Sequence, residues 1–111
     1  MTREKAVASE ATRFTDPGQA PNAWVDQLLG PAMSLGTYSI PAGGTDDQVP
    51  HREDEIYVVV SGRAALFVDG QRLDVGAGSA VYVRAGQVHR FTDVVEDLTV
   101  LVVFAPPYSG R

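Results

Sequence analysis

The chain has 111 residues, 44% of them apolar, so it is long enough to bury one hydrophobic core without disulfides. Fourteen acidic residues against nine basic ones give a net charge of -5, which argues against DNA or RNA as a partner. The absence of cysteine excludes disulfides, zinc–thiolate sites and thiol nucleophiles. A bound metal would therefore take nitrogen or oxygen ligands.

The first part of the chain, residues 1–22, is polar and is interrupted by Pro17, Gly18 and Pro21. We expect it to form an arm that precedes the core. It has no apolar run long enough for a signal peptide or a membrane span. We therefore expect a soluble cytoplasmic protein without a membrane partner, in which residues 23–111 form a single folded domain.

The rest of the chain consists of short apolar or alternating segments separated by Gly, Pro and Asp, which is typical of an all-β sandwich or barrel. Asp69-Gly70 is the strongest short-range signal for a hairpin. Pro106-Pro107 cannot continue a central strand, so we expect the C-terminal tail to end the fold at the surface. The clearest strands are predicted at residues 33–40, 56–61, 64–68, 79–83, 88–91 and 98–104, with a weaker one at 23–29.

The chain has two histidines, His51 and His89, and both lie beside predicted strands. His51, Glu53 and Glu55 alternate, so a strand here would place all three side chains on one face. Closing a barrel would bring His89 opposite His51. Two histidines and one carboxylate form the facial triad of non-haem Fe(II) oxygenases, and the set also suits Mn, Ni, Co or Zn. Composition alone favours ordinary solvated residues beside turns, and only the motif spacing argues against that reading.

The spacing resembles the first conserved motif of the cupin superfamily, which runs Gly, five residues, His-x-His, three or four residues, Glu, six residues, Gly. Here Gly43 is followed at these intervals by Val49, His51, Glu55 and Gly62. Val49 occupies the place of the first histidine. An alternative alignment puts His51 at that place, with a two-residue deletion after it.

The second cupin motif runs Gly, five residues, Pro-x-Gly, two residues, His, three residues, Asn. The corresponding residues are Gly78, Arg84-Ala85-Gly86, His89 and Asp93. Arginine replaces the proline and aspartate replaces the asparagine, while both glycines and the histidine are in register.

The resemblance implies a single-domain cupin barrel, also called a double-stranded β-helix or jelly roll, with one divalent transition metal (Fe, Zn, Ni, Mn or Co) in its mouth. It implies His51, Glu55 and His89 as metal ligands and leaves the fourth ligand open. Glu53 is the nearest candidate on the same face under both alignments, as a ligand or as an acid/base group. A homodimer is also a family expectation.

Cupins include dioxygenases, isomerases, decarboxylases, lyases and non-catalytic storage or sensing domains, and the fold does not choose among them. We expect a metal-dependent enzyme acting on a small organic substrate by dioxygenase-like or isomerase/lyase-like chemistry, because three protein ligands leave open positions at the metal. One alternative is a non-catalytic module that binds or senses a small molecule. Another is a degenerate site that has lost its metal.

Glu53 and Tyr57 are the candidates for catalysis by proton transfer or substrate orientation, and Tyr57 shares the parity of Glu55 along its strand. Arg84, Phe91 and Tyr82 are candidates for substrate binding. Arg84 suits a substrate carboxylate, and Phe91 shares the parity of His89. For Tyr57 and Phe91 the alternative is a core aromatic, and for Arg84 it is an exposed ion-pair residue.

Overall fold

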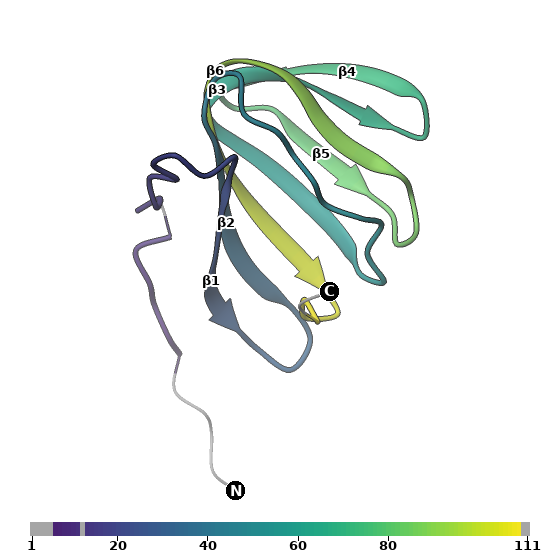
Figure 1. Cartoon of the computed structure of the whole chain (residues 1–111). Coiled ribbons are helices and arrows are strands. Elements are labelled where there is room, and N and C mark those ends of the chain that lie inside the picture. The colour runs from purple at the N-terminus through teal and green to yellow at the C-terminus, as the bar shows by residue number, and fades with distance from the viewer. Residues whose placement is uncertain (1–5, 12, 110–111) are drawn as a thin grey trace, which may run out of the picture.

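The structure is a computed structural model that describes residues 6–11 and 13–109. These residues form one antiparallel sheet and no helix (Figure 1), so none of them could belong to a membrane-crossing helix. The strand order is β1-β2-β6-β3-β4, and β5 also pairs with β3. The strands are β1 (Ala23–Leu29), β2 (Ser34–Ile40), β3 (Asp54–Val68), β4 (Gln71–Gly76), β5 (Ala80–Val83) and β6 (His89–Ala105).

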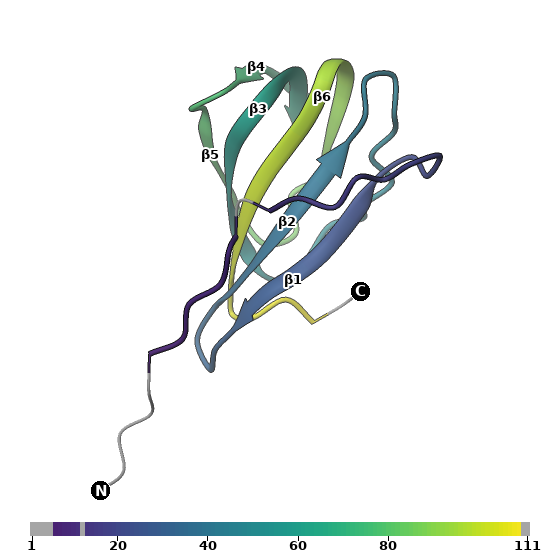
Figure 2. The ribbon, with the colours of Figure 1, turned by 90° about the vertical axis from the view of Figure 1, so that its left-hand side faces the viewer.

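β3 and β6 are the two long strands, and they pair from Asp54↔Ala105 at one end to Val68↔His89 at the other. β3 includes two segments that were predicted as separate strands, 56–61 and 64–68. β6 likewise joins the predicted strands at 88–91 and 98–104, beginning at His89. That division was wrong, because the glycine and polar residues between the segments stay within the ladder. They appear there as register shifts between Val59 and Ala65. Because bulged strands bend, the sheet curls around its concave face (Figure 2).

The hairpin predicted at Asp69-Gly70 is confirmed. Val68 pairs with Gln71, and the φ angles of Asp69 and Gly70 are 47° and 84°, the positive values that a two-residue type I′ turn requires. The strand that follows, β4, was not predicted. It is mostly polar because it is an edge strand, and polar residues on an edge strand discourage pairing with further strands.

The hydrophobic core lies on the concave face of the sheet. Alternate residues of β3 and β6 are buried there, as a half-buried strand requires. Each large side chain buried in this way stabilises the fold by about 1.5–3 kcal/mol. The main contributors are Tyr38, Ile40, Tyr57, Val59, Leu66, Phe91, Leu98, Val100, Val102 and Phe104.

Gly62 lies in the bent part of β3, and its φ of +92° is in the left-handed region. A Cβ atom at this position would overlap the backbone carbonyl of Asp97 in β6. Glycine is therefore required here both by the backbone conformation and by the close approach of the paired strand.

We predict that Gly62→Ala lowers the free energy of unfolding by about 3 kcal/mol, because a strained φ and an overlap with backbone add together. Urea denaturation followed by circular dichroism measures this loss. Gly70→Ala is the matched control, since φ there is +84° but nothing lies within 4 Å of the added Cβ. It should cost about 1 kcal/mol. Equal losses in the two variants would show that the close approach at Gly62 does not matter.

Candidate metal centre

The three residues expected to bind metal, His51, Glu55 and His89, come together at one end of the core. One donor atom from each lies within 4.8 Å of the donors of the other two. All three residues are buried, with exposed fractions of 6%, 2% and 4%. His89 Nε2 is 2.7 Å from Glu55 Oε1. The fold thus places two imidazoles and a carboxylate around one point away from solvent.

Backbone contacts position the first two of these residues. His51 lies three residues before the start of β3, and its carbonyl oxygen accepts a hydrogen bond from the Gly86 N–H at 2.8 Å. The loop of the second sequence motif is thereby tied to the first. Glu55 pairs with Phe104 of β6 on one side and with Val83 of β5 on the other. Its side chain is buried and therefore faces the concave side of the sheet.

His89 is the first residue of β6, and its Nδ1–H donates a hydrogen bond to the Gln87 carbonyl oxygen at 2.8 Å. This bond fixes the tautomer and leaves Nε2 directed at Glu55. Burial disfavours the imidazolium, but the Glu55 carboxylate and the Gln87 carbonyl outweigh it and raise the pKa of His89 above its usual 6.5. The surroundings of Nε2 therefore favour a positive charge.

This donor set suits one divalent transition metal ion, because imidazole nitrogens and a carboxylate are typical ligands of Fe, Zn, Ni, Mn and Co. With metal–ligand bonds of about 2.0–2.2 Å, adjacent ligands lie about 3.0 Å apart at right angles and about 3.4 Å apart in a tetrahedron. The separations between the three donors, from 2.7 Å up to at most 4.8 Å, bracket these values.

Tyr57 lies two residues beyond Glu55 on the same face of β3 and is 1% exposed. Its hydroxyl donates a hydrogen bond to Gln48 Oε1 at 3.0 Å. Burial and the neighbouring Glu55 carboxylate raise the pKa of Tyr57 well above 10. At neutral pH the hydroxyl is therefore a hydrogen-bond donor, and a part in proton transfer stays a prediction.

Glu53 is buried on the same side of the chain as His51 and Glu55, but the group of converging donors does not include it. Its Oε2 accepts a hydrogen bond from Ser109 Oγ at 2.9 Å, which holds the C-terminal segment against the sheet. The structure therefore gives Glu53 a structural contact. Its predicted role as an acid/base group stays a prediction.

The three residues expected to bind substrate, Arg84, Phe91 and Tyr82, lie apart from the pocket beside the donors. Arg84 is exposed in the turn after β5. Phe91 is buried in the core and packs edge-on against Tyr57, with ring centres 4.9 Å apart. Tyr82 is 57% exposed and donates a hydrogen bond to Asp54. Substrate contacts by these three residues stay predictions.

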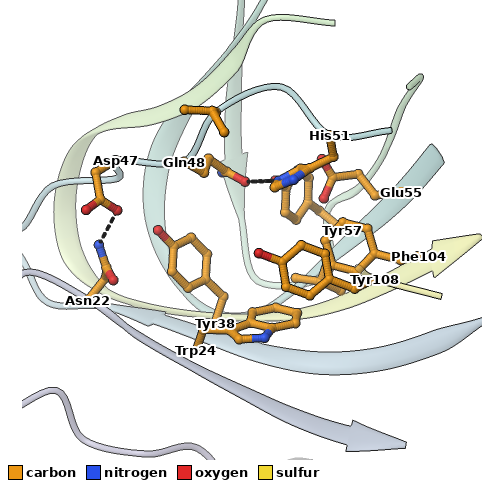
Figure 3. A pocket seen from close by; sticks show the side chains of 12 residues that line it. Asn22, Trp24, Tyr38, Asp47, Gln48, His51, Glu55, Tyr57, Phe104 and Tyr108 are labelled. Carbon is orange, nitrogen blue, oxygen red and sulfur yellow. Dashed lines mark hydrogen bonds between the residues drawn. The ribbon is translucent and has the colours of Figure 1, made fainter. Parts of the chain in front are cut away.

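A pocket of about 270 Å³ opens beside the donors, and His51 and Glu55 form part of its wall (Figure 3). A metal ion held there would face the pocket. Among the described residues that line it there is no lysine or arginine. The lining residues are Asn22, Trp24, Tyr38, Asp47, Gln48, Val49, His51, Glu55, Tyr57, Val102, Phe104 and Tyr108.

Four aromatic side chains, Trp24, Tyr38, Phe104 and Tyr108, form another part of the pocket wall. Trp24 lies edge-on to Tyr38, Phe104 and Tyr108, with ring centres 5.4–6.2 Å apart. Phe104 and Tyr108 stack at 4.6 Å. Gly36 of β2 makes room for the tryptophan, because a Cβ there would overlap the indole ring. The wall is thus a packed aromatic surface.

The C-terminal segment after β6 folds back to the pocket. The Tyr108 N–H donates a hydrogen bond to Ser34 Oγ at 2.9 Å, and the Tyr108 ring packs edge-on against His51 with ring centres 5.5 Å apart. Residues 106–109 lie at the surface, exposed or half-buried, as predicted, but the contact of Tyr108 with the pocket was not predicted. In the sequence, nothing about Pro106-Pro107 indicates that Tyr108 will contact the pocket.

Sequence reasoning also missed Trp24, Tyr38 and Gln48 as residues of the site. Trp24 is the only tryptophan of the chain and lies on a predicted strand, which was a usable signal. Tyr38 alternates with the core residue Ile40, so its burial follows from the pattern but its position in the pocket does not. Gln48 lies in the spacer of the first motif, where the motif specifies no residue.

Comparison with known proteins identifies the family. The Cupin domain family matches residues 36–104, which are more than half of the chain and include all three candidate ligands. The chain is a member of the cupin family. An uncharacterized protein of Streptomyces coelicolor is 49% identical to this cupin over 100 residues, which cover 90% of this chain and 91% of that protein.

Solved structures share the fold of this cupin. An RmlC-like cupin family protein with a double-stranded β-helix fold from Methanocaldococcus jannaschii has a TM-score of 0.73 at 16% identity, covering 96% of this chain and 94% of that chain. KdgF from Halomonas sp. has a TM-score of 0.72 at 18% identity, covering 87% and 86%. The predicted all-β cupin fold is confirmed.

The two buried glutamates provide a matched test of the metal centre. We predict that Glu55→Gln weakens the binding of Co(II) or Zn(II) by more than about 10-fold, because it removes a charged donor from the group. Glu53→Gln should leave the affinity almost unchanged, since a glutamine can still accept the Ser109 hydrogen bond. Titration against a chelator of known affinity measures both. Equal weakening in the two variants would place Glu53 among the ligands.

Proposed function

We propose that this cupin is a metal-dependent enzyme acting on a small organic substrate that binds in the pocket beside His51 and Glu55. The observation that carries the proposal is that His51 and Glu55, two members of the buried His/Glu/His group, lie in the wall of an aromatic pocket. Structural metal sites are closed by protein ligands, whereas catalytic sites keep a position open to the substrate. The pocket supplies that access.

A divalent transition metal bound here would supply Lewis acidity, and in the case of iron also redox chemistry, to a substrate in the pocket. The side chains around it would bind and orient that substrate. Trp24 and Tyr108 offer ring surfaces that exclude water and pack against an apolar or planar group. The Tyr57 hydroxyl stays protonated and can donate a hydrogen bond.

The composition of the pocket limits the class of substrate. Its volume of about 270 Å³ is just below the range of about 300–1,000 Å³ that drug-sized ligands occupy. Asp47 and Glu55 are acidic, and the described lining offers no guanidinium or ammonium group. We infer a small substrate with one oxygen donor for the metal and an apolar or planar body. A second anionic group would have no basic partner.

Ligand entry can be followed directly, because Trp24 is the only tryptophan and lines the pocket. We predict that a substrate or its analogue changes the intrinsic fluorescence of the metal-loaded protein in a saturable way. Small carboxylates, enols and amino-acid derivatives form the panel. Monoanions should bind more tightly than dianions of the same size, and the reverse order would contradict the inferred substrate class.

Turnover separates an enzyme from a sensing module. Protein loaded in turn with Fe(II), Mn(II), Ni(II) or Zn(II) is incubated with the ligands found by fluorescence, both anaerobically and with O2, and products are followed by mass spectrometry. We predict conversion that disappears in Glu55→Gln and persists in Gln71→Leu, which changes an exposed residue at the start of β4. A need for O2 would indicate dioxygenase-like chemistry, and conversion without O2 would indicate isomerase or lyase chemistry. Binding without conversion under every condition would support a non-catalytic module instead.

A further inference from the structure

Gln48 brings a side-chain oxygen into the group of metal donors. The residue after it, Val49, occupies the place of the first histidine in the family motif, but Val49 is 56% exposed and has no donor atom. The Gln48 side chain instead turns inward and points at His51 (Figure 3). A potential ligand is therefore present one residue before the position where the motif places one.

The distances match those between neighbouring ligands of one metal ion. Gln48 Oε1 lies 3.0 Å from His51 Nε2 and 3.2 Å from His89 Nε2. Two ligands with bonds of about 2.0–2.2 Å at right angles to each other lie about 3.0 Å apart. The amide oxygen thus stands beside both imidazole nitrogens at the spacing of adjacent ligands.

A buried carboxylate determines which end of the Gln48 amide faces the histidines. Gln48 Nε2 donates a hydrogen bond to Asp46 Oδ2 at 2.6 Å, and Asp46 is 3% exposed. The same carboxylate accepts hydrogen bonds from the Tyr38 hydroxyl at 2.7 Å and the Phe91 N–H at 2.9 Å. An ionised carboxylate can only accept, so it must face the NH2 group. The amide oxygen is consequently directed at His51 and His89.

Gln48 Oε1 can interact on two sides, with the Tyr57 hydroxyl on one and with the histidines on the other. An amide oxygen has two lone pairs, and the Tyr57 hydroxyl donates to it at 3.0 Å. On the other side, neutral His89 presents Nε2 as an electron-pair donor, because its Nδ1–H is bonded to the Gln87 carbonyl. Gln48 Oε1 and Glu55 Oε1 lie 3.2 Å and 2.7 Å from this nitrogen. Electron-pair donors this close repel unless they share a proton or a metal cation.

We propose that Gln48 Oε1 is a fourth protein ligand of the metal and takes the place of the first histidine of the cupin motif. This inference rests on the metal centre of the proposed function. It makes the site a set of two histidines, one glutamate and one glutamine. A neutral carbonyl oxygen in place of an imidazole makes the set more favourable to ions that prefer oxygen, such as Mn(II), than a site with three histidines.

The test compares Gln48→Leu, which removes the amide and keeps a side chain of similar length, with Gln71→Leu, the same change at the exposed start of β4. The full chain is stripped with chelator and reloaded with Co(II) or Mn(II). Gln48→Leu should weaken Co(II) binding about 10–100-fold. It should also change the visible Co(II) spectrum and raise the water-proton relaxivity of bound Mn(II), because water replaces the amide oxygen. Gln71→Leu should match the wild type in all three measurements.

Gln48→Asn is a second variant that keeps the amide but withdraws its oxygen by one methylene group, so the inference stays testable if the leucine variant fails to fold. Far-UV circular dichroism of the metal-free proteins checks folding. Wild-type Co(II) affinity, spectrum and Mn(II) relaxivity in a folded Gln48 variant would overturn the inference and leave the proposed function intact. A wild-type protein that binds neither ion would overturn both.

Discussion

The bend in the β3–β6 ladder is the constraint on which the site depends. Glu55 pairs with Phe104 near one end of this ladder, and His89 pairs with Val68 at the other. In a straight strand, the 13 steps between Glu55 and Val68 would separate these ends by roughly 40 Å. In the structure Glu55 Oε1 and His89 Nε2 are 2.7 Å apart. The register shifts around Gly62 fold the two long strands over together, so that the ends of one ladder meet across the concave face.

The chemistry of the site follows from what this fold buries. The curled sheet removes a glutamate and two histidines from water at the end of an otherwise apolar core, and a buried carboxylate is costly unless a positive charge compensates it. A cation bound at the His/Glu/His group would provide that compensation. Around the group, Gln87 holds His89 and Asp46 holds Gln48 by hydrogen bonds. Such outer contacts fix the orientation of metal ligands.

Much of the site could be predicted from local features of the sequence. The alternation from His51 to Glu55 is confirmed by the burial of these residues and the exposure of Arg52 between them. Asp93 replaces the asparagine of the second motif, and its φ of 49° explains why, since both residue types tolerate the left-handed conformation. What could not be predicted depends on long-range contacts. In the sequence Gly62 looks like the end of a strand, and only its pairing with β6 shows that the strand continues. The direction of the Gln48 side chain depends on Asp46, which contacts with the core hold in place.

The central claim is that His51, Glu55 and His89 together bind one divalent metal ion. Anomalous diffraction from crystals of the metal-loaded protein, recorded on both sides of the absorption edge of the metal, tests it most directly. The account predicts a single strong anomalous peak per chain, about 2.0–2.2 Å from the Nε2 atoms of both histidines and from a Glu55 carboxylate oxygen. A peak elsewhere on the chain, or no peak at these residues in crystals grown with saturating metal, would contradict the claim.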